Sequence, residues 1–213
     1  MERSELYPKV YMWLTLGLII TFLTGYSVSI NEKMLMNILS GGSYMIVVIL
    51  ELAVAIFFSI RLPKMSKLTA VVCYILYSFL TGLTFSVLFV EFKIASIIMI
   101  FLVTAIVFAI FSVIGFVSKT NFNGIGKYLF MALCIVVVTS IVNMFIGSNT
   151  FNLIITIISA IIFMAYIMYD MNKIEMLTSI NEDAGPIYAA FQLYLDFINL
   201  FIDLLRLFGE SKD

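Results

Sequence analysis

The 213-residue chain is 63% hydrophobic and 12% charged, whereas soluble domains average about 45–50% apolar and about 25% charged residues. A water-soluble fold of this length cannot bury so much apolar area, so the composition excludes a soluble enzyme and a disordered protein. The net charge of −1 gives no sign of a nucleic-acid partner, and the absence of histidine removes the usual titrating group near neutral pH.

Seven apolar runs are long enough to cross a bilayer, since a spanning helix needs about 20 residues. They cover residues 10–30, 43–60, 68–90, 94–117, 127–147, 151–177 and 187–208. The short connections between the runs contain glycine, proline and asparagine, which are typical of turns. An example is Ala184-Gly185-Pro186 before the last run. We therefore predict an all-α integral membrane protein with seven transmembrane helices in a single domain, residues 1–213.

Lysine and arginine predict the orientation of these spans, because cytoplasmic loops carry an excess of both residues. With a cytoplasmic N-terminus, eight of them fall on the inner side and four on the outer side. This bias predicts that the N-terminus is cytoplasmic and the C-terminus outside.

Polar residues form one narrow stripe along the last span. They are Gln192, Asp196, Asn199, Asp203 and Arg206, and their spacings of 4, 3, 4 and 3 keep them within an arc of roughly 80°. Such a stripe faces either an aqueous cavity or other polar helices, as in a hydrogen-bonded interface with no pathway. Asp196 lies roughly 13–14 Å from the start of the span, near the middle of the hydrocarbon layer, where a charge is costly.

Asp170 lies at a similar depth on the preceding span, because spans 151–177 and 187–208 are consecutive and antiparallel. Two carboxylates that approach closely cannot both ionise easily, so Asp170 and Asp196 are expected to share a proton. This pair would be a pH switch without histidine. The alternative is that Asp170 faces the cytoplasm at the end of its helix.

Two further charged residues, Glu51 and Arg61, lie in or at the end of the second span. Arg61 ends the second span, either as a simple positive-inside anchor or as a latch for the ionised aspartates. Glu51, in the middle of that span, and Arg206 are a candidate structural ion pair on the outer half. Asp203, three residues before Arg206, is the competing local partner.

The end of the chain resembles a known family. YDMNKI at residues 169–174 and LYLDFINLFIDLLR at 193–206, together with FLTGLT at 79–84, look like the transmembrane Bax inhibitor motif family and its bacterial YetJ-like branch. The resemblance implies a central seventh helix surrounded by two three-helix layers. It also implies a passive calcium leak gated by protonation of Asp170 and Asp196, with Arg61 as the latch. The chain departs from the expected pattern at Asp203, where an asparagine is expected.

These observations predict a pH-sensitive calcium-permeable channel or leak rather than an enzyme. Gln192, Asn199 and Asp203 would line the pore, and Asp170 and Asp196 are candidate calcium ligands, because hard cations prefer oxygen. We expect no tightly bound cofactor, calcium as the permeant ion, protons and the lipid bilayer as the other partners, a monomer, and a bacterial plasma membrane location. An intramembrane aspartyl protease or a proton-coupled cation exchanger would use the same two aspartates.

Overall fold

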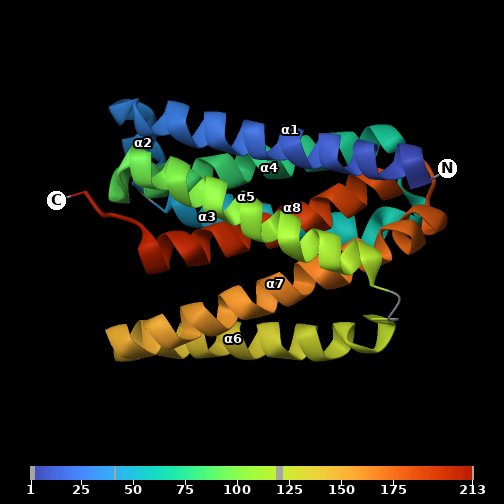
Figure 1. The fold of residues 1–213 in the computed structure, drawn as a ribbon. Coiled ribbons are helices and arrows are strands. Elements are labelled where there is room, and N and C mark those ends of the chain that lie inside the picture. Colours follow the sequence, from blue (N-terminus) through green and yellow to red (C-terminus); the bar gives the residue numbers. More distant parts are fainter. Residues whose placement is uncertain (1–2, 41, 119–121, 213) are drawn as a thin grey trace. The chain divides into compact units, whose positions relative to one another are not determined.

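The computed structural model describes residues 3–40, 42–118 and 122–212. Over these residues the fold is all-helical (Figure 1). Within them a single β-bridge joins Phe92 to Ser211. The helices are α1 (Arg3–Ser29), α2 (Glu32–Leu39), α3 (Ser43–Arg61), α4 (Lys67–Glu91), α5 (Ile94–Val117), α6 (Gly126–Ile146), α7 (Asn149–Ile180) and α8 (Gly185–Phe208), with short 3-10 turns at Leu62–Lys64 and Phe122–Gly124. In the described part of the chain, all of the α-helices except α2 are long and apolar enough to cross a membrane, which confirms the seven predicted spans.

The structure differs from the predicted elements at α2 and at two helix ends. The short α2 lies in a segment predicted as a connection, and it begins where the Asn31 side chain accepts a hydrogen bond from the Met34 backbone N–H at 3.1 Å. Helix α1 begins at Arg3 rather than residue 10, and α7 runs three residues past the predicted end, to Ile180. Hydropathy marks the apolar stretch of a helix, whereas hydrogen bonding continues into its polar ends.

The chain forms two compact units. The first contains Met1–Lys93, Ile174–Tyr194 and Ser211–Asp213, and the second contains Ile94–Lys173 and Leu195–Glu210. Helices α7 and α8 therefore each contribute one end to the first unit and the other end to the second.

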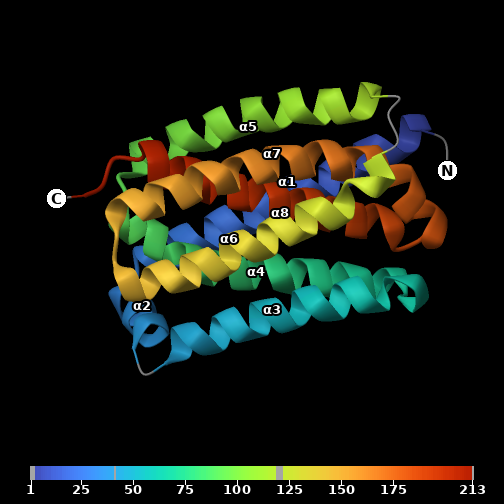
Figure 2. The same cartoon turned by 90° about the horizontal axis from the view of Figure 1, so that it is seen from below.

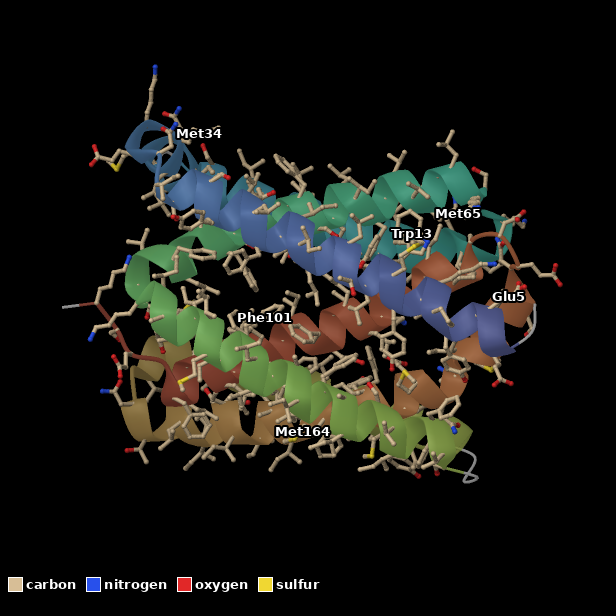
Figure 3. The ribbon with its side chains drawn as sticks, turned by 45° about the horizontal axis from the view of Figure 1, so that its top comes forward. Glu5, Trp13, Met34, Met65, Phe101 and Met164 are labelled. Atoms are coloured by element: carbon tan, nitrogen blue, oxygen red, sulfur yellow. The ribbon has the colours of Figure 1, made fainter. Side chains whose placement is uncertain are left out.

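In the first unit α1 and α4 lie side by side along their length (Figure 1), and α3 packs on α4 (Figure 2). Trp13 of α1, labelled in Figure 3, meets the ring of Tyr74 edge to face, and the Tyr74 hydroxyl donates to the Trp13 carbonyl at 2.9 Å. Thr21 donates to the Ser78 carbonyl and shares a 2.5 Å hydrogen bond with the hydroxyl of Tyr194. Buried hydroxyl groups of this unit are thus satisfied across helices, as an apolar environment requires.

In the second unit, α6 packs against α7 through an apolar cluster centred on Val136, Ile155 and Ile162. Helix α5 meets α8 through Phe101, labelled in Figure 3, whose ring centroid is 5.2 Å from that of Phe197. Glycine allows the closest approach between helices, because a Cβ at Gly115 of α5 would lie 2.5 Å from the Met168 carbonyl oxygen of α7. These contacts hold the segment of α7 that carries Asp170.

The outer surfaces of the helices are apolar, as expected for contact with lipid. Large exposed side chains include Ile49 and Ile56 of α3, Ile106 of α5, and Ile135 and Phe145 of α6. Helix α8 contrasts with α6, because 72% of its most apolar stretch is buried and only 6% of that of α6 is. The polar stripe therefore lies on the helix that is most withdrawn from the surface.

Candidate functional site

Asp170 of α7 and Asp196 of α8 both belong to the second unit. Their side chains are 6% and 4% exposed, and the two carboxyl groups are hydrogen-bonded to each other. An ionised carboxylate only accepts hydrogen bonds, so two carboxyl groups can bond to each other only when one of them holds a proton. Within the described residues, Asp196 Oδ2 has no hydrogen-bond partner. The geometry is that of two buried carboxyl groups within interaction distance of each other, one of which keeps an oxygen without a partner.

A tyrosine and a lysine lie beside this pair. Tyr166 neighbours both carboxyl groups, and Lys173 lies close enough to Asp170 to interact with its charge. The Lys173 ammonium donates to the Tyr169 hydroxyl at 2.7 Å and lies 4.2 Å from the centre of that ring. The sequence analysis did not assign a role to Lys173, although its spacing of three residues from Asp170 places both on one helix face.

Local contacts fix the position of this part of α7. The Asn172 amide donates to the carbonyl oxygens of Gly115 and Ser118, at 3.4 and 3.3 Å. These carbonyls lie at the C-terminal end of α5, where backbone acceptors lack partners in their own helix. The Tyr169 ring rests against Gly126 at the start of α6, where a larger residue would collide with its hydroxyl. The segment of α7 that carries Asp170 is therefore held by contacts with α5 and with α6.

Glu51 and Arg61 lie on α3 in the first unit, and Arg61 is exposed. The half-buried Glu51 carboxylate accepts hydrogen bonds from Thr81 at 2.7 Å and from Thr84 at 3.4 Å, both on α4. The predicted latch role of Arg61 and the predicted pairing of Glu51 with Arg206 stay predictions. The two threonines were missed, because contacts between helices leave no spacing signal in a single sequence.

Two side chains of the polar stripe on α8 form hydrogen bonds within α8 itself. Gln192 donates to the Tyr188 hydroxyl at 3.1 Å, and Asn199 donates to the Leu195 carbonyl at 2.7 Å. Asp203 differs, because it is 6% exposed and its Oδ2 has no hydrogen-bond partner in the described part of the chain. The stripe thus combines two locally bonded amides with two carboxylates that each keep an oxygen open.

A cavity of about 280 Å³ lies next to Asp203 within the second unit. Its lining comes from α6, α7 and α8 and includes the polar side chains of Ser140, Asn143, Asn152, Thr156, Ser159, Asp203 and Arg206. No group of three or more His, Cys, Asp or Glu side chains gathers around a common point in the described residues. The candidate calcium ligands Asp170 and Asp196 are therefore a pair of carboxyl groups.

Seven long apolar helices in the described part of the chain, with carboxyl groups buried on α7 and α8, define a multi-pass integral membrane protein. Residues 3–213 match the family described as "Inhibitor of apoptosis-promoting Bax1". The inner membrane protein YbhL of Escherichia coli is 36% identical over 214 residues, which cover 96% of this chain and 91% of the relative. The chain belongs to this Bax inhibitor-like family.

Other relatives come from distant bacteria. An uncharacterized protein of Borreliella burgdorferi is 33% identical over 99% of this chain and 94% of its own length. An uncharacterized membrane protein of Streptococcus pyogenes is 32% identical over 98% of this chain and 92% of the relative. These relatives match the chain from end to end, in agreement with the resemblance seen in its last two spans.

Proposed function

We propose that this protein is a passive, pH-sensitive calcium leak of a bacterial plasma membrane, and that it is not an enzyme. The observation that carries the proposal is the hydrogen-bonded pair of buried carboxyl groups, Asp170 and Asp196, on two membrane-spanning helices. Family membership supports it through the resemblance to the calcium-leak branch, and a relative named as an inner membrane protein supports the location.

The proposed gate follows from the charge states of this pair. With one proton between them, the two carboxyl groups attract each other and hold α7 to α8. When that proton leaves, two negative charges face each other in a medium of low dielectric constant and repel. The closed state binds the additional proton, so its stability falls as the pH rises. Separation would leave two carboxylates, which suit a hard cation such as calcium.

The proposal is tested by calcium flux into vesicles that contain purified protein and a calcium-sensitive dye. We expect flux down the gradient that is faster at about pH 8 than at about pH 6, because the pair is ionised more often at higher pH. Empty vesicles and vesicles with the Asp196→Asn variant are the controls. Flux no greater than that of empty vesicles at every pH would refute the leak.

Experiments with the same vesicles distinguish the leak from the two alternative functions, a proton-coupled exchanger and an intramembrane aspartyl protease. A proton-coupled exchanger would move calcium against its gradient when a proton gradient is imposed, whereas a leak would only dissipate the calcium gradient. An intramembrane aspartyl protease would cleave a helical peptide embedded in the vesicles. We expect neither activity.

A further inference from the structure

The cavity beside Asp203 has a buried base and an open mouth. Asn143, Thr156, Ser159 and Asp203 at its base are at most 9% exposed, whereas Ser140, Asn152 and Arg206 are exposed. Its volume of about 280 Å³ is far above the roughly 10–15 Å³ that one water needs. The cavity can therefore admit a small hydrated solute from one side.

Asp203 is the one carboxylate at the base of this cavity. The Ser159 hydroxyl is hydrogen-bonded to the carboxylate, and the Arg206 guanidinium lies one turn further along α8. The other carboxylate oxygen, Oδ2, is buried and has no partner in the described part of the chain. A buried acceptor without a partner is costly, so this oxygen needs a ligand in the cavity.

The surroundings of Asp203 favour a positively charged ligand. The Thr156 hydroxyl donates its proton to the Asn152 carbonyl at 2.9 Å, which leaves the lone pairs of the hydroxyl oxygen for a ligand. Asn143 lies in the last turn of α6, and Asp203 and Arg206 lie near the end of α8. The C-terminal ends of α6 and α8 carry partial negative charge and attract cations, whereas the start of α7, which carries Asn152, has the opposite partial charge. Carboxylate, hydroxyl and amide oxygens are also the ligands that hard cations prefer.

We propose that this cavity is a weak binding site for a hydrated hard cation of the calcium class, with Asp203 as its anionic ligand. Arg206 is the competing cation, because it lines the same cavity and is close enough to Asp203 to interact with its charge. The site lies about 10 Å along α8 from Asp196, two helical turns away. This inference rests on the proposed function and adds to it a second cation site, at the end of α8 away from the acid pair.

The test measures equilibrium binding of radioactive calcium to purified protein in detergent. It uses the Asp170→Asn, Asp196→Asn double variant as background, so that the acid pair contributes no carboxylate. We expect one bound calcium per chain in this background. Adding Asp203→Asn should weaken binding at least about tenfold, since even the outer-shell partners of metal ligands are worth that much. Adding Arg206→Gln should tighten binding, because the competitor is gone.

Two controls separate binding from folding. Asp183→Asn removes an exposed carboxylate and should leave binding unchanged, and thermal unfolding without calcium shows whether each variant folds like the background. The inference is overturned if the background binds no calcium, if Asp203→Asn binds as tightly, or if Arg206→Gln weakens binding. Arg206 is exposed, so its substitution should not impair folding. Calcium binding by the Arg206→Gln variant therefore tests the inference even if the Asp203→Asn variant does not fold.

Vesicle flux distinguishes failure of this inference from failure of the proposed function. Flux in the wild-type protein without calcium binding in the double variant would overturn the cavity site and leave the leak standing. Calcium binding that depends on Asp203, without any flux, would refute the leak and leave the cavity site standing.

Discussion

Asp170 and Asp196 are two buried carboxyl groups in a membrane-spanning segment, where an unpaired charge is costly. A single ionised carboxylate at the centre of a spanning helix costs about 2.5–3.5 kcal/mol on insertion scales. In the proposed closed state, one shared proton removes one of the two charges and satisfies one oxygen of each group. The same bond makes the contact between α7 and α8 depend on pH, which is the physical basis of the proposed gate.

The first prediction concerns this pair. Asp170→Asn and Asp196→Asn should each abolish the pH dependence of calcium flux, because either change removes the coupled titration, and combining them should add little. The measurement is vesicle flux across a pH series, with Asp183→Asn as the exposed-carboxylate control. If both single variants keep the wild-type curve, the pair is not the pH sensor.

The second prediction concerns the cation beside the pair. Lys173 favours the ionised form of Asp170, so Lys173→Gln should move the midpoint of the flux curve to higher pH without removing the pH dependence. The predicted latch, Arg61, is compared through Arg61→Ala, which should also shift the curve. A shift with Arg61→Ala and none with Lys173→Gln would show that Arg61 alone is the latch.

At the scale of helices, small residues and buried hydroxyls decide which helix faces meet. In the second unit Gly115 lets α5 approach the backbone of α7, and Asn172 binds the end of α5. In the first unit Thr81 and Thr84 of α4 bind Glu51 of α3. Lipid is as apolar as leucine, so close packing and hydrogen bonds, rather than hydrophobicity, select these partners.

The third prediction tests the contact between α5 and α7. Gly115→Ala should destabilise the protein by about 1–3 kcal/mol, because its Cβ would meet the Met168 backbone, which cannot move aside as a flexible side chain can. The matched control is Gly124→Ala, where no atom lies within 4 Å of an added Cβ. The measurement is thermal unfolding in detergent. Equal melting temperatures for the two variants would contradict the close contact.

The fourth prediction concerns Glu51. Glu51→Gln should lower the melting temperature, and a double-mutant cycle with Thr81→Val should show coupling of about 1 kcal/mol or more, since hydrogen bonds to charged groups are strong. A parallel cycle with Arg206→Gln tests the predicted ion pair. Coupling to Thr81 alone would leave Asp203 as the partner of Arg206.

At the scale of the whole molecule, the apolar outer surface and the charged loops determine how the chain sits in a bilayer. The spans expose isoleucine, leucine, valine and phenylalanine to lipid. Lysine and arginine in the short connections predict a cytoplasmic N-terminus. Orientation then decides which end of α8 meets which compartment.

The fifth prediction tests this orientation by cysteine labelling in intact cells. Cys73 and Cys134 are free thiols and are first replaced by serine. An impermeant maleimide should then label Lys33→Cys, in an outer connection, but label Glu182→Cys only after the cells are opened. Both positions are exposed, so they are matched in access. The reverse pattern would place the N-terminus outside.

Much of this protein follows from the sequence by itself. Seven apolar runs determine seven spanning helices, because length and hydropathy suffice for a helix that must satisfy its own backbone in lipid. The depth of Asp170 and Asp196 could likewise be counted along two antiparallel helices. The capped α2 escaped the hydropathy analysis because it is short and partly polar, although Asn31 followed by Glu32 is a start signal.

Only the tertiary structure decided which side chains meet. The bond between the two carboxyl groups, the place of Lys173 beside them, the threonines on Glu51 and the cavity beside Asp203 all depend on how helices rotate and approach. Apart from the polar stripe of α8, hydropathy is nearly the same on every face of helices such as α1, α5, α6 and α7, so it carries little information about their rotation. That rotation is decided by a few small residues and polar bonds, such as Gly115 with Met168 and Asn172 with the end of α5, whose partners lie far away in the chain.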